Sequence, residues 1–410
     1  MNYKEKQIAI VGEGIEGMDA KTYFEELGAQ VTTLDQKKDP NYLKDLNKYD
    51  LVVRSPGVYP DKLKNAKQVT TPMQIFFDNC PAKIIGVTGT KGKGTTSTLI
   101  YEILKNAGLD VYLAGNIGKP YLELLNHKRS LANFVGKSYI ILELSSFQLI
   151  DLKKSPYIAV VLNITSDHMD WHKNQNEYLK AKANIVRYQS STDFAVINEE
   201  YQTSKDFSKL TKAQVEYFSK NKLDNKYKKG LILRGQHNLE NIAAAVGVAK
   251  ILEISDESII KVVRNFKGLE HRLEFVREVF GIKFYNDSFA TGPQPTIAAI
   301  KSFTEPITLI LGGSDKGLKY RDLGFEIEKH NNVKNLILIG EIGEKIGKGI
   351  NNKKIINLGK TSMNRIIEVA LEITPKGGVV LLSPAAASFD MFKDYKDRGN
   401  QFKEAVNNLR

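Results

Sequence analysis

The stretch Gly86–Ser97, which reads Gly-Val-Thr-Gly-Thr-Lys-Gly-Lys-Gly-Thr-Thr-Ser, constrains the fold more than any other part of the chain. An apolar run, Lys83–Ile85, precedes it, and a run with helical character, Leu99–Leu104, follows it. A strand, a glycine-rich loop and a helix in this order present backbone N–H groups and a helix N-terminus to phosphate. Lys93 can reach a β- or γ-phosphate, and a threonine after it can contact Mg²⁺. We therefore expect an α/β domain that binds a nucleoside triphosphate.

Composition limits the class of protein and its partners. A chain of 410 residues with 42% apolar and 26% charged residues is expected to form two or three soluble globular domains. The single cysteine, Cys80, suits a reducing compartment, and neither a signal peptide nor a membrane-spanning run is visible, so we expect a cytoplasmic protein. The net charge of +12 could serve nucleic acid or anionic small molecules. Because the lysines are spread along the whole chain, we favour a solvated surface, and expect a monomer without nucleic-acid or membrane partners.

Strand-like and helix-like runs alternate along the chain, which predicts parallel sheets in three successive α/β units. We place these units at residues 1–81, 82–268 and 269–410. Expected strands are Ile8–Val11, Val31–Leu34, Asp50–Arg54, Tyr139–Leu142, Ile158–Leu162, Phe194–Ile197, Ile307–Leu311, Leu336–Ile339 and Val379–Leu382. Expected helices include Gly17–Leu27 and Asn238–Ile254, and the Lys- and Asn-rich Ser219–Gly230 reads as a turn or hairpin tip.

A second glycine motif, Gly12-Glu-Gly-Ile-Glu-Gly17, follows the first expected strand, and Asp35 lies at the end of the next one. Alone, this pattern indicates NAD with Asp35 on a ribose hydroxyl, or a purely structural turn. A dehydrogenase has no use for the triphosphate loop, however, and a UDP-sugar would use the same glycine turn and helix N-terminus.

Several polar residues sit at expected strand ends or helix starts. Glu143 is a candidate Mg²⁺ ligand or a solvated charge, and His168 is a candidate metal or phosphate contact. Spacing alone makes Lys182 a surface lysine. Asn238 and Asn241 could face a nucleotide or cap their helix. Further along lie Arg272, Asp287 and Lys316, an arginine, an acid and a lysine that suit an anion and a ribose.

Taken together, the motifs resemble those of the Mur ligases over nearly the whole chain, and in the same order. The segments that carry the resemblance are Ser55–Gly57, Thr88–Thr95, Gly115–Gly118, Glu143–Leu149, Asn163–Asp170, Tyr178–Ile185, Gly235–Asn241, His271-Arg272, Asn286–Thr291, Gly312–Gly317 and Leu382–Phe392. Glu-Leu-Ser-Ser-Phe-Gln-Leu and Ser-Pro-Ala-Ala-Ala-Ser-Phe-Asp are particularly similar to the D-glutamate-adding member of that family.

This resemblance implies an α/β fold of three domains: a Rossmann-like domain for a UDP substrate, a central P-loop domain for ATP, and a C-terminal Rossmann-like domain for glutamate. It implies that ATP phosphorylates the carboxylate of UDP-N-acetylmuramoyl-L-alanine, that the D-glutamate amine attacks the acyl phosphate, and that phosphate leaves. It further implies two Mg²⁺ ions and a carbamylated Lys182, which overturns the surface reading of that lysine. The glycine motif Gly12–Gly17 is accordingly reassigned from NAD to UDP.

The same resemblance assigns roles to individual residues. The catalytic residues implied are Lys93, Glu143, His168 and Lys182, and the metal site would use Thr95, Glu143, His168 and Lys182. ATP contacts would come from Gly89, Thr90, Lys91, Gly92, Lys93, Gly94, Thr95, Thr96, Asn238, Asn241, Arg272 and Asp287. The UDP substrate would contact Gly14, Ile15, Asp35, Gln36, Ser55, Asn116 and His168. Glutamate would contact Arg272, Thr291, Lys316, Ser383 and Phe389.

Three departures from the family pattern leave alternatives open. Gly94 replaces the usual Thr or Ser after the loop lysine, as in folylpolyglutamate synthases, so either of the next two threonines could meet Mg²⁺. Lys91 replaces the usual Asn, and Phe289 replaces the usual Lys of an Asn-Asp-Ser-Lys-Ala-Thr motif. The alternatives are therefore an L-glutamate-adding or folylpolyglutamate synthase-like ligase, and an inactive nucleotide-binding regulator.

Overall fold

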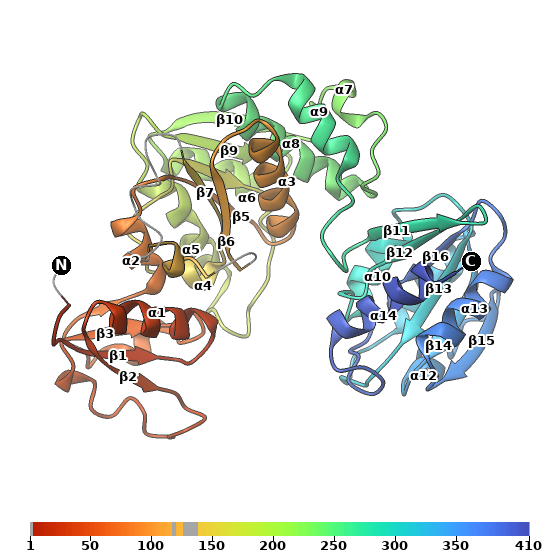
Figure 1. Ribbon diagram of the computed structural model, residues 1–410, viewed down its shortest axis with the longest axis horizontal. Helices are drawn as coiled ribbons and strands as arrows, with labels where there is room; N and C mark the ends of the chain where they lie inside the picture. The colour runs from red at the N-terminus through yellow and green to blue at the C-terminus, as the bar shows by residue number, and fades with distance from the viewer. Residues whose placement is uncertain (1–2, 117–119, 126–137, 410) are drawn as a thin grey trace. The chain divides into compact units, whose positions relative to one another are not determined.

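The structure is a computed structural model that describes residues 3–116, 120–125 and 138–409 (Figure 1). Its residues group into two compact units, which we describe separately. The first unit comprises residues 1–227 and 240–263, and the second comprises residues 228–239 and 264–410. None of the helices in the described ranges is long and apolar enough to cross a membrane.

The first unit begins with a four-stranded parallel sheet in the order β2-β1-β3-β4. Its elements are β1 (Gln7–Val11), α1 (Ile15–Glu26), β2 (Gln30–Leu34), β3 (Leu51–Arg54), β4 (Val69–Thr70) and α2 (Pro72–Asn79). In β1, Ile8 and Ile10 join one apolar core while Ala9 and Val11 join another, so both faces of the sheet are covered. This explains why the strands of a parallel sheet read as continuous apolar runs.

A six-stranded parallel sheet follows in the order β10-β9-β8-β5-β7-β6. Its strands are β5 (Lys83–Thr88), β6 (Val111–Gly115), β7 (Tyr139–Glu143), β8 (Ile158–Val161), β9 (Phe194–Asn198) and β10 (Gln214–Phe218). Its helices are α3 (Lys93–Asn106), α4 (Ser146–Leu149), α5 (Gln175–Arg187), α6 (Gln202–Lys205), α7 (Asn225–Lys228), α8 (Gln236–Ile251) and α9 (Asp256–Asn265). Val87 pairs with Glu143 and Thr88 with Val161, so the carboxyl ends of β5, β7 and β8 meet at one edge. Ligands of parallel α/β sheets bind at such an edge.

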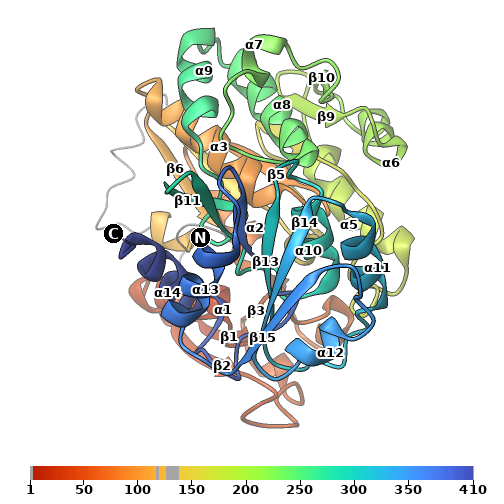
Figure 2. The same ribbon diagram turned by 90° about the vertical axis from the view of Figure 1, so that its right-hand side faces the viewer.

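The second unit is built on a sheet in the order β11-β12-β16-β13-β14-β15. Only the pairing of β11 with β12 is antiparallel, and Figure 2 shows β13, β14 and β15 running side by side. The strands are β11 (Glu274–Val279), β12 (Ile282–Asn286), β13 (Ile307–Gly312), β14 (Val333–Ile339), β15 (Lys354–Gly359) and β16 (Val379–Leu382). The helices are α10 (Pro293–Ile300), α11 (Arg321–Lys329), α12 (Gly343–Gly347), α13 (Met363–Ile373) and α14 (Tyr395–Asn407).

The structure confirms the expected α/β class and every strand named from the sequence, each to within three residues at its ends. One expectation is wrong in part. Residues 220–222 do form a turn, but β10 pairs with β9 in parallel, so Ser219–Gly230 is not a hairpin tip. The segment instead holds α7, whose Tyr227 is fully buried and donates its hydroxyl to Asp256.

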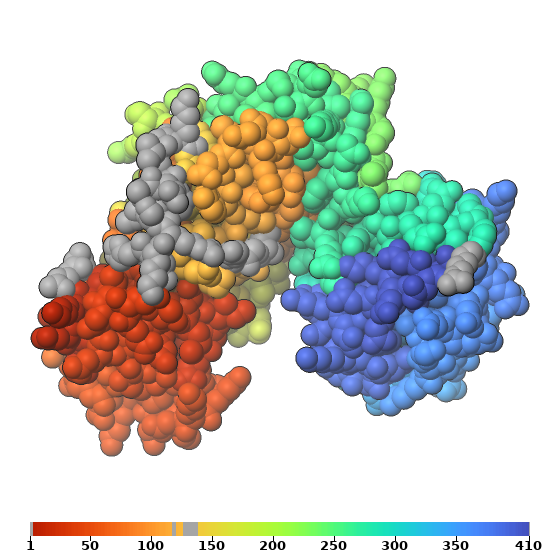
Figure 3. Space-filling model, in the orientation of Figure 1, coloured from red at the N-terminus to blue at the C-terminus, as the bar shows by residue number. Residues whose placement is uncertain are grey.

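Within the first unit, side chains join the four-stranded and six-stranded sheets, and Figure 3 shows the red surface of the first meeting the orange and yellow surface of the second. Arg54 at the end of β3 pairs with Asp151 after α4, and Tyr59 donates its hydroxyl to Glu177 in α5. These contacts hold the segments that carry the candidate site.

Candidate active site

The phosphate loop adopts the strand–loop–helix form that the sequence predicts. β5 ends at Thr88, and α3 begins at Lys93 after Gly92, whose φ of +87° lies in the left-handed region that favours glycine. A Cβ on Gly92 would also collide with the side-chain oxygen of Asn241. The first helical hydrogen bond runs from the Thr96 N–H to the Gly92 carbonyl, so the N–H groups at the start of α3 precede the helical ladder. Such N–H groups are the ones that bind phosphate.

Polar side chains fix the loop from outside. The Thr90 hydroxyl, which is almost fully buried, donates to the Thr165 carbonyl at 3.1 Å and lies 2.9 Å from the Tyr178 hydroxyl. The Lys91 N–H donates to Asn163 Oδ1 at 3.0 Å, whereas the Lys91 side chain is exposed. Thr90 thus supports the loop, and Lys91 is positioned to add positive charge at its surface.

The two threonines after Gly94 have different environments. The Thr96 hydroxyl is fully buried and donates to Asn241 Oδ1 at 3.2 Å. Thr95 is half-buried on the first turn of α3. The side chain that remains accessible beside the loop is therefore that of Thr95.

Lys182 is a buried lysine in α5, only 2% exposed. Its Nζ donates to the Gly89 carbonyl at 2.9 Å and to Thr88 Oγ1 at 3.2 Å. Burial, with a further contribution from the positive charge of Lys93, lowers the pKa of Lys182 well below its usual value, while Asp167 and Glu143 act in the opposite direction. The surface reading of Lys182 is wrong, because the amphipathic pattern of α5 places it against the loop.

Glu143 ends β7 and His168 follows β8, and these two strands flank β5 in the sheet. Glu143 is the last residue of β7 and is 9% exposed. His168 follows β8 with a φ of +55°, a strained conformation for a non-glycine residue that often marks a functional position. Its ring packs edge-on against Phe147 of α4, with centroids 4.8 Å apart. Within the described ranges, no three His, Cys, Asp or Glu side chains form a ready-made metal cluster.

All the residues expected on the UDP side except His168 line one cavity of about 460 Å³ beside β1, β2 and β3. They are Gly14, Ile15, Asp35, Gln36, Ser55 and Asn116. Gly17 must be glycine, since a Cβ there would collide with the Gly12 carbonyl oxygen. The Asp35 carboxylate accepts the N–H groups of Glu13 and Lys37, both at 2.9 Å, and these bonds lower the pKa of Asp35. Of the Gly115–Gly118 motif, residues 117 and 118 lie outside the described residues.

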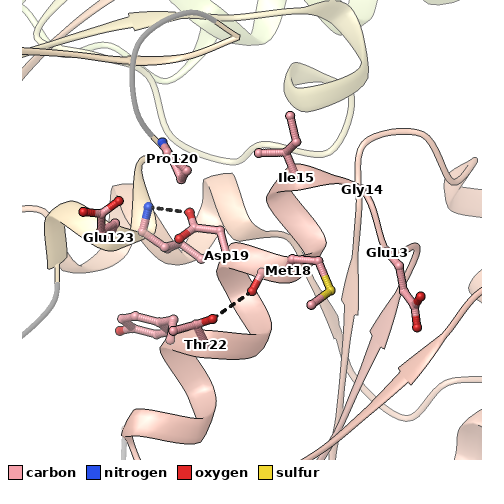
Figure 4. Close-up of a pocket in the computed structure, with 10 residues that line it drawn as sticks. Glu13, Gly14, Ile15, Met18, Asp19, Thr22, Pro120 and Glu123 are labelled. Carbon is pink, nitrogen blue, oxygen red and sulfur yellow. Dashed lines mark hydrogen bonds between the residues drawn. The ribbon is translucent and has the colours of Figure 1, made fainter.

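A second cavity, of about 580 Å³, lies on the other side of Gly14 and Ile15 along α1 (Figure 4). Its wall includes Asp19, which accepts the Leu122 N–H at 2.9 Å and whose pKa burial raises to about 6. Apart from Gly14 and Ile15, the residues that the resemblance assigns to the UDP substrate do not line this second cavity.

In the second unit, Arg272 and Asp287 lie next to β11 and β12. The exposed Arg272 guanidinium lies over the ring of Phe289, 3.9 Å from its centroid, and that ring packs edge-on against Tyr395. Asp287 accepts from the Leu273 N–H at 3.1 Å and from Ser383 Oγ at 2.7 Å, and complete burial raises its pKa to about 7. Phe289, which stands where the family usually has a lysine, thus stacks with the guanidinium of Arg272.

Ser383, which the resemblance assigns to glutamate contact, forms hydrogen bonds with buried groups of the second unit. Ser383 is 0% exposed, and its hydroxyl also lies 3.0 Å from that of Thr296. It supports Asp287 from inside the protein. Phe389, by contrast, is 69% exposed, Lys316 is exposed, and Thr291 is half-buried.

The loops that carry Lys316 and Phe389 are joined. The Ser314 N–H donates to the Ala387 carbonyl at 2.9 Å, and the Asp390 N–H donates to Ser314 Oγ at 2.8 Å. Two segments about seventy residues apart in the sequence therefore form one surface of the second unit.

Asn238 and Asn241 both lie in the first turns of α8 and are buried. The Asn238 amide donates to the carbonyl of Arg234, which precedes the helix. Asn241 receives the Thr96 hydroxyl, which ties α8 to the phosphate loop. Asn238 thus fixes the segment before α8, and Asn241 supports the loop.

Sequence reasoning missed three residues that organise the site. Tyr178 is fully buried against Thr90, and Arg54 and Arg398 are fully buried arginines. Arg398 of α14 donates to the carbonyls of Ser288 and Ala386 at 2.8 and 3.1 Å, and burial lowers its pKa to about 10. For Arg54, the sequence did contain a signal: an arginine that directly follows an apolar strand run. A charged side chain in such a place is buried only when it is paired, so a buried ion pair could have been expected there.

Comparison with known proteins places the chain in a family. Residues 87–249 match the model of the Mur ligase middle domain, and residues 271–386 match that of the Mur ligase glutamate ligase domain. The chain is 38% identical to the UDP-N-acetylmuramoylalanine–D-glutamate ligase of Acetivibrio thermocellus, over 99% of this chain and 97% of that protein. It is 37% identical to the ligase of the same name from Clostridium tetani, over 98% of this chain and 97% of that protein.

Solved structures share the fold at lower identity. The MurF ligase of Thermotoga maritima in complex with ADP is 18% identical with a TM-score of 0.58, over 98% of this chain and 96% of that one. The UDP-N-acetylmuramate–alanine ligase MurC of Thermotoga maritima is 16% identical with a TM-score of 0.59, over 99% of this chain and 100% of that one. The near-complete match to relatives above 30% identity, together with the fold and the phosphate loop, shows that this chain belongs to the Mur ligase family, in the group of the UDP-N-acetylmuramoylalanine–D-glutamate ligases.

Proposed function

We propose that the protein is an ATP-dependent ligase that adds D-glutamate to UDP-N-acetylmuramoyl-L-alanine, in the cytoplasmic synthesis of peptidoglycan precursors. The observation that carries this proposal is the full-length similarity to ligases of that name, at 38% and 37% identity. The shape of the phosphate loop and the cavity beside Gly14 and Ser55 support it independently. We further propose three domains, 1–81, 82–268 and 269–410, each built on one of the three sheets.

In the proposed reaction, a carboxylate oxygen of the UDP substrate attacks the γ-phosphorus of ATP, and ADP leaves. The D-glutamate amine then attacks the acyl carbon, loses a proton, and inorganic phosphate leaves. The N-terminus of α3 and Lys93 would bind the ATP phosphates, because backbone N–H groups and a lysine stabilise charge that develops during phosphoryl transfer. The remaining loop residues, Gly89–Gly92 and Gly94, would shape the cradle.

The donors beside the loop fit Mg²⁺, a cation that prefers oxygen ligands and retains waters. We propose Thr95 and Glu143 as its oxygen ligands, with His168 at a second ion. When bound, Mg²⁺ would neutralise phosphate charge and hold the acceptor carboxylate near the γ-phosphate. Thr96 is not proposed as a ligand, because its hydroxyl is buried against Asn241.

We propose that Lys182 is carbamylated. The lowered pKa of Lys182 favours its neutral amine, and a neutral amine can add CO₂ with loss of a proton to form an N-carboxylate. The product carries a negative charge close to Glu143 and the Mg²⁺ site. It also removes the unfavourable approach of two cations, Lys93 and Lys182, at the loop.

For the remaining substrate contacts, the UDP moiety would occupy the cavity lined by Gly14, Ile15, Asp35, Gln36, Ser55 and Asn116. Arg272 and Asp287 would contact the nucleotide, with Asn241 supporting the loop and Asn238 near the start of α8. D-Glutamate would contact Arg272, Thr291, Lys316 and Phe389, with Ser383 acting through Asp287. We propose a monomer, without nucleic-acid or membrane partners.

Phosphate release tests the proposal directly. Purified protein with ATP and Mg²⁺ is given UDP-N-acetylmuramoyl-L-alanine and either glutamate enantiomer. Release that requires the UDP substrate and D-glutamate supports the proposed function. Release with L-glutamate alone would identify the other enantiomer, and no release with either would indicate the inactive regulator that the Phe289 departure suggested.

A further inference from the structure

Arg54 is the last residue of β3 and is 0% exposed. Its Nε and Nη2 donate to both carboxylate oxygens of Asp151, at 2.8 and 2.7 Å, in a bidentate pair. A guanidinium has five N–H donors in a fixed planar arrangement. The bidentate pair with Asp151 therefore leaves N–H groups of Arg54 that need other acceptors. In Arg54 these donors bind backbone carbonyls on two sides.

On one side, Arg54 organises the wall of the UDP cavity. Its Nη1 donates to the carbonyls of Val58 at 2.6 Å and of Ser55 and Pro56, both at 3.3 Å. All three residues line the cavity. Ser55 in turn donates its hydroxyl to the Gly12 carbonyl at 2.6 Å, which extends the same network to the glycine turn.

On the other side, Arg54 reaches the segment that follows Glu143. Its Nη2 donates to the Phe147 carbonyl of α4 at 3.0 Å, and the ring of Phe147 packs against His168. One guanidinium therefore contacts the cavity wall and the segment that carries the proposed metal-binding side chains.

A second connection runs parallel to this one. Glu16, in the first turn of α1, is largely buried and accepts from Gln148 Nε2 at 2.7 Å. Gln148 Oε1 accepts the Ser145 N–H at 2.7 Å, as part of the capping box that starts α4. Two adjacent residues of α4, Phe147 and Gln148, are thus tied to Arg54 and to Glu16 at the cavity wall.

We propose that Arg54 is a positioning residue for the ligase reaction: it fixes the UDP cavity relative to the Glu143–Phe147 segment. The inference rests on the proposed function. A substrate held by its UDP end must present its distant carboxylate to the γ-phosphate, and a misplacement of about 1 Å can cost roughly 100-fold in rate. Arg54 sets that spacing.

Stability alone does not account for this arrangement. Burying an ion pair removes two charges from water, and well-packed apolar residues often stabilise a protein equally well. An apolar residue could not, however, bind the carbonyls of Ser55, Pro56, Val58 and Phe147 at once. The guanidinium of Arg54 therefore fixes the relative positions of these carbonyl groups, which an apolar side chain cannot do.

The test compares Arg54→Met, Arg54→Lys and Asp151→Asn with the wild type. Arg187→Met is the control, because Arg187 is an exposed arginine of the same unit. For each variant one measures kcat, the KM for each substrate, binding of UDP by calorimetry, and Tm.

For Arg54→Met we expect a rise of about tenfold in the KM for the UDP substrate and a fall of about 100-fold in kcat. The KM for ATP should stay within about twofold, because Arg54 makes no contact with the phosphate loop. Arg54→Lys keeps the charge but not the fork, so it should resemble Arg54→Met, and Arg187→Met should match the wild type.

A purely structural role would lower Tm and leave both KM values of the folded fraction unchanged, which would overturn the inference. Should Arg54→Met not fold, Asp151→Asn decides: Asp151 is 29% exposed, and we expect the same selective rise in the KM for the UDP substrate, by about threefold. An unchanged KM in this variant would also overturn the inference. If the wild type neither binds UDP nor releases phosphate, the proposed function itself fails. If the wild type is active and its variants have the same kinetic constants, only the inference about Arg54 fails.

Discussion

Lys93 and Lys182 donate to the same acceptor, the carbonyl oxygen of Gly89, at 3.0 and 2.9 Å. Two ammonium groups at one oxygen repel each other, and Lys182 is the buried partner. Burial and this repulsion lower the pKa of Lys182, which favours the neutral amine that the proposed carbamylation requires.

Replacing Lys182 by Ala should lower activity by roughly 100-fold, because the anion proposed beside the Mg²⁺ site is lost. Acetate or formate at millimolar concentration should restore part of the activity by occupying the vacated space. The phosphate-release assay measures both effects. Lys180→Ala, an exposed lysine of the same helix, is the matched control and should retain full activity. A fully active Lys182→Ala variant would contradict the role.

Asp287 should make the protein less stable as pH rises from about 4 to 7. Its pKa is about 7 in the folded protein against 3.8 for an unperturbed carboxyl, so the folded state keeps a proton that the unfolded state loses in this window. The stabilisation is present below pH 4 and is lost as pH rises through 7. Urea unfolding at pH 5 and pH 7.5 checks this: Asp287→Asn should flatten the pH dependence of the free energy of unfolding. The exposed Asp322→Asn should leave it unchanged, and an equal slope in all three proteins would refute the prediction.

Thr95 and Thr96 should fail in different ways. Thr95→Val should raise the Mg²⁺ concentration needed for half-maximal activity by about tenfold, whereas Thr95→Ser, which keeps the hydroxyl, should stay within about threefold. Thr96→Val removes the buried bond to Asn241 and should mainly lower stability, by about 1 kcal/mol. Activity titrated against Mg²⁺, together with thermal unfolding, separates the two. The reverse pattern would assign the cation to Thr96.

The stacking of Arg272 on Phe289 should strengthen binding of the substrate that Arg272 contacts. A cation over an aromatic face contributes about 0.5–2 kcal/mol, so Phe289→Leu should raise the KM for D-glutamate or ATP by about 2- to 30-fold. Phe289→Tyr keeps the face and should stay near the wild type. Steady-state kinetics on both substrates provide the measurement, with the exposed Phe325→Leu as control. No change in Phe289→Leu would mean that the stack is incidental.

Lys316→Ala and Phe389→Ala should each raise the KM for D-glutamate more than the KM for ATP, by about tenfold against less than about twofold. The reason is that both side chains are accessible on one surface of the second unit, formed by the joined 312–317 and 382–392 loops. Equal rises for the two substrates would count against a glutamate site on this surface.

Much of the fold was predictable because local patterns agree with it. The apolar runs around Ile8, Ile140 and Val379 are continuous since parallel strands are covered on both faces. The glycines at positions 17 and 92 mark places where a Cβ would meet backbone or side-chain oxygen. The Ser219–Gly230 stretch was partly misread because its polar composition hides the apolar contact of Tyr227.

The sequence by itself determined the strand–loop–helix of the phosphate site, the second glycine turn and the family, because each is written in consecutive residues. Only the tertiary structure decided which side chains share a location. It buried Lys182 beside Lys93 and paired the Thr96 hydroxyl with Asn241. It also directed the Ser383 hydroxyl inward to Asp287, and it paired Arg54 with Asp151, which lies 97 positions away in the sequence. These facts depend on burial and on contacts between distant segments, which local propensity and spacing do not contain.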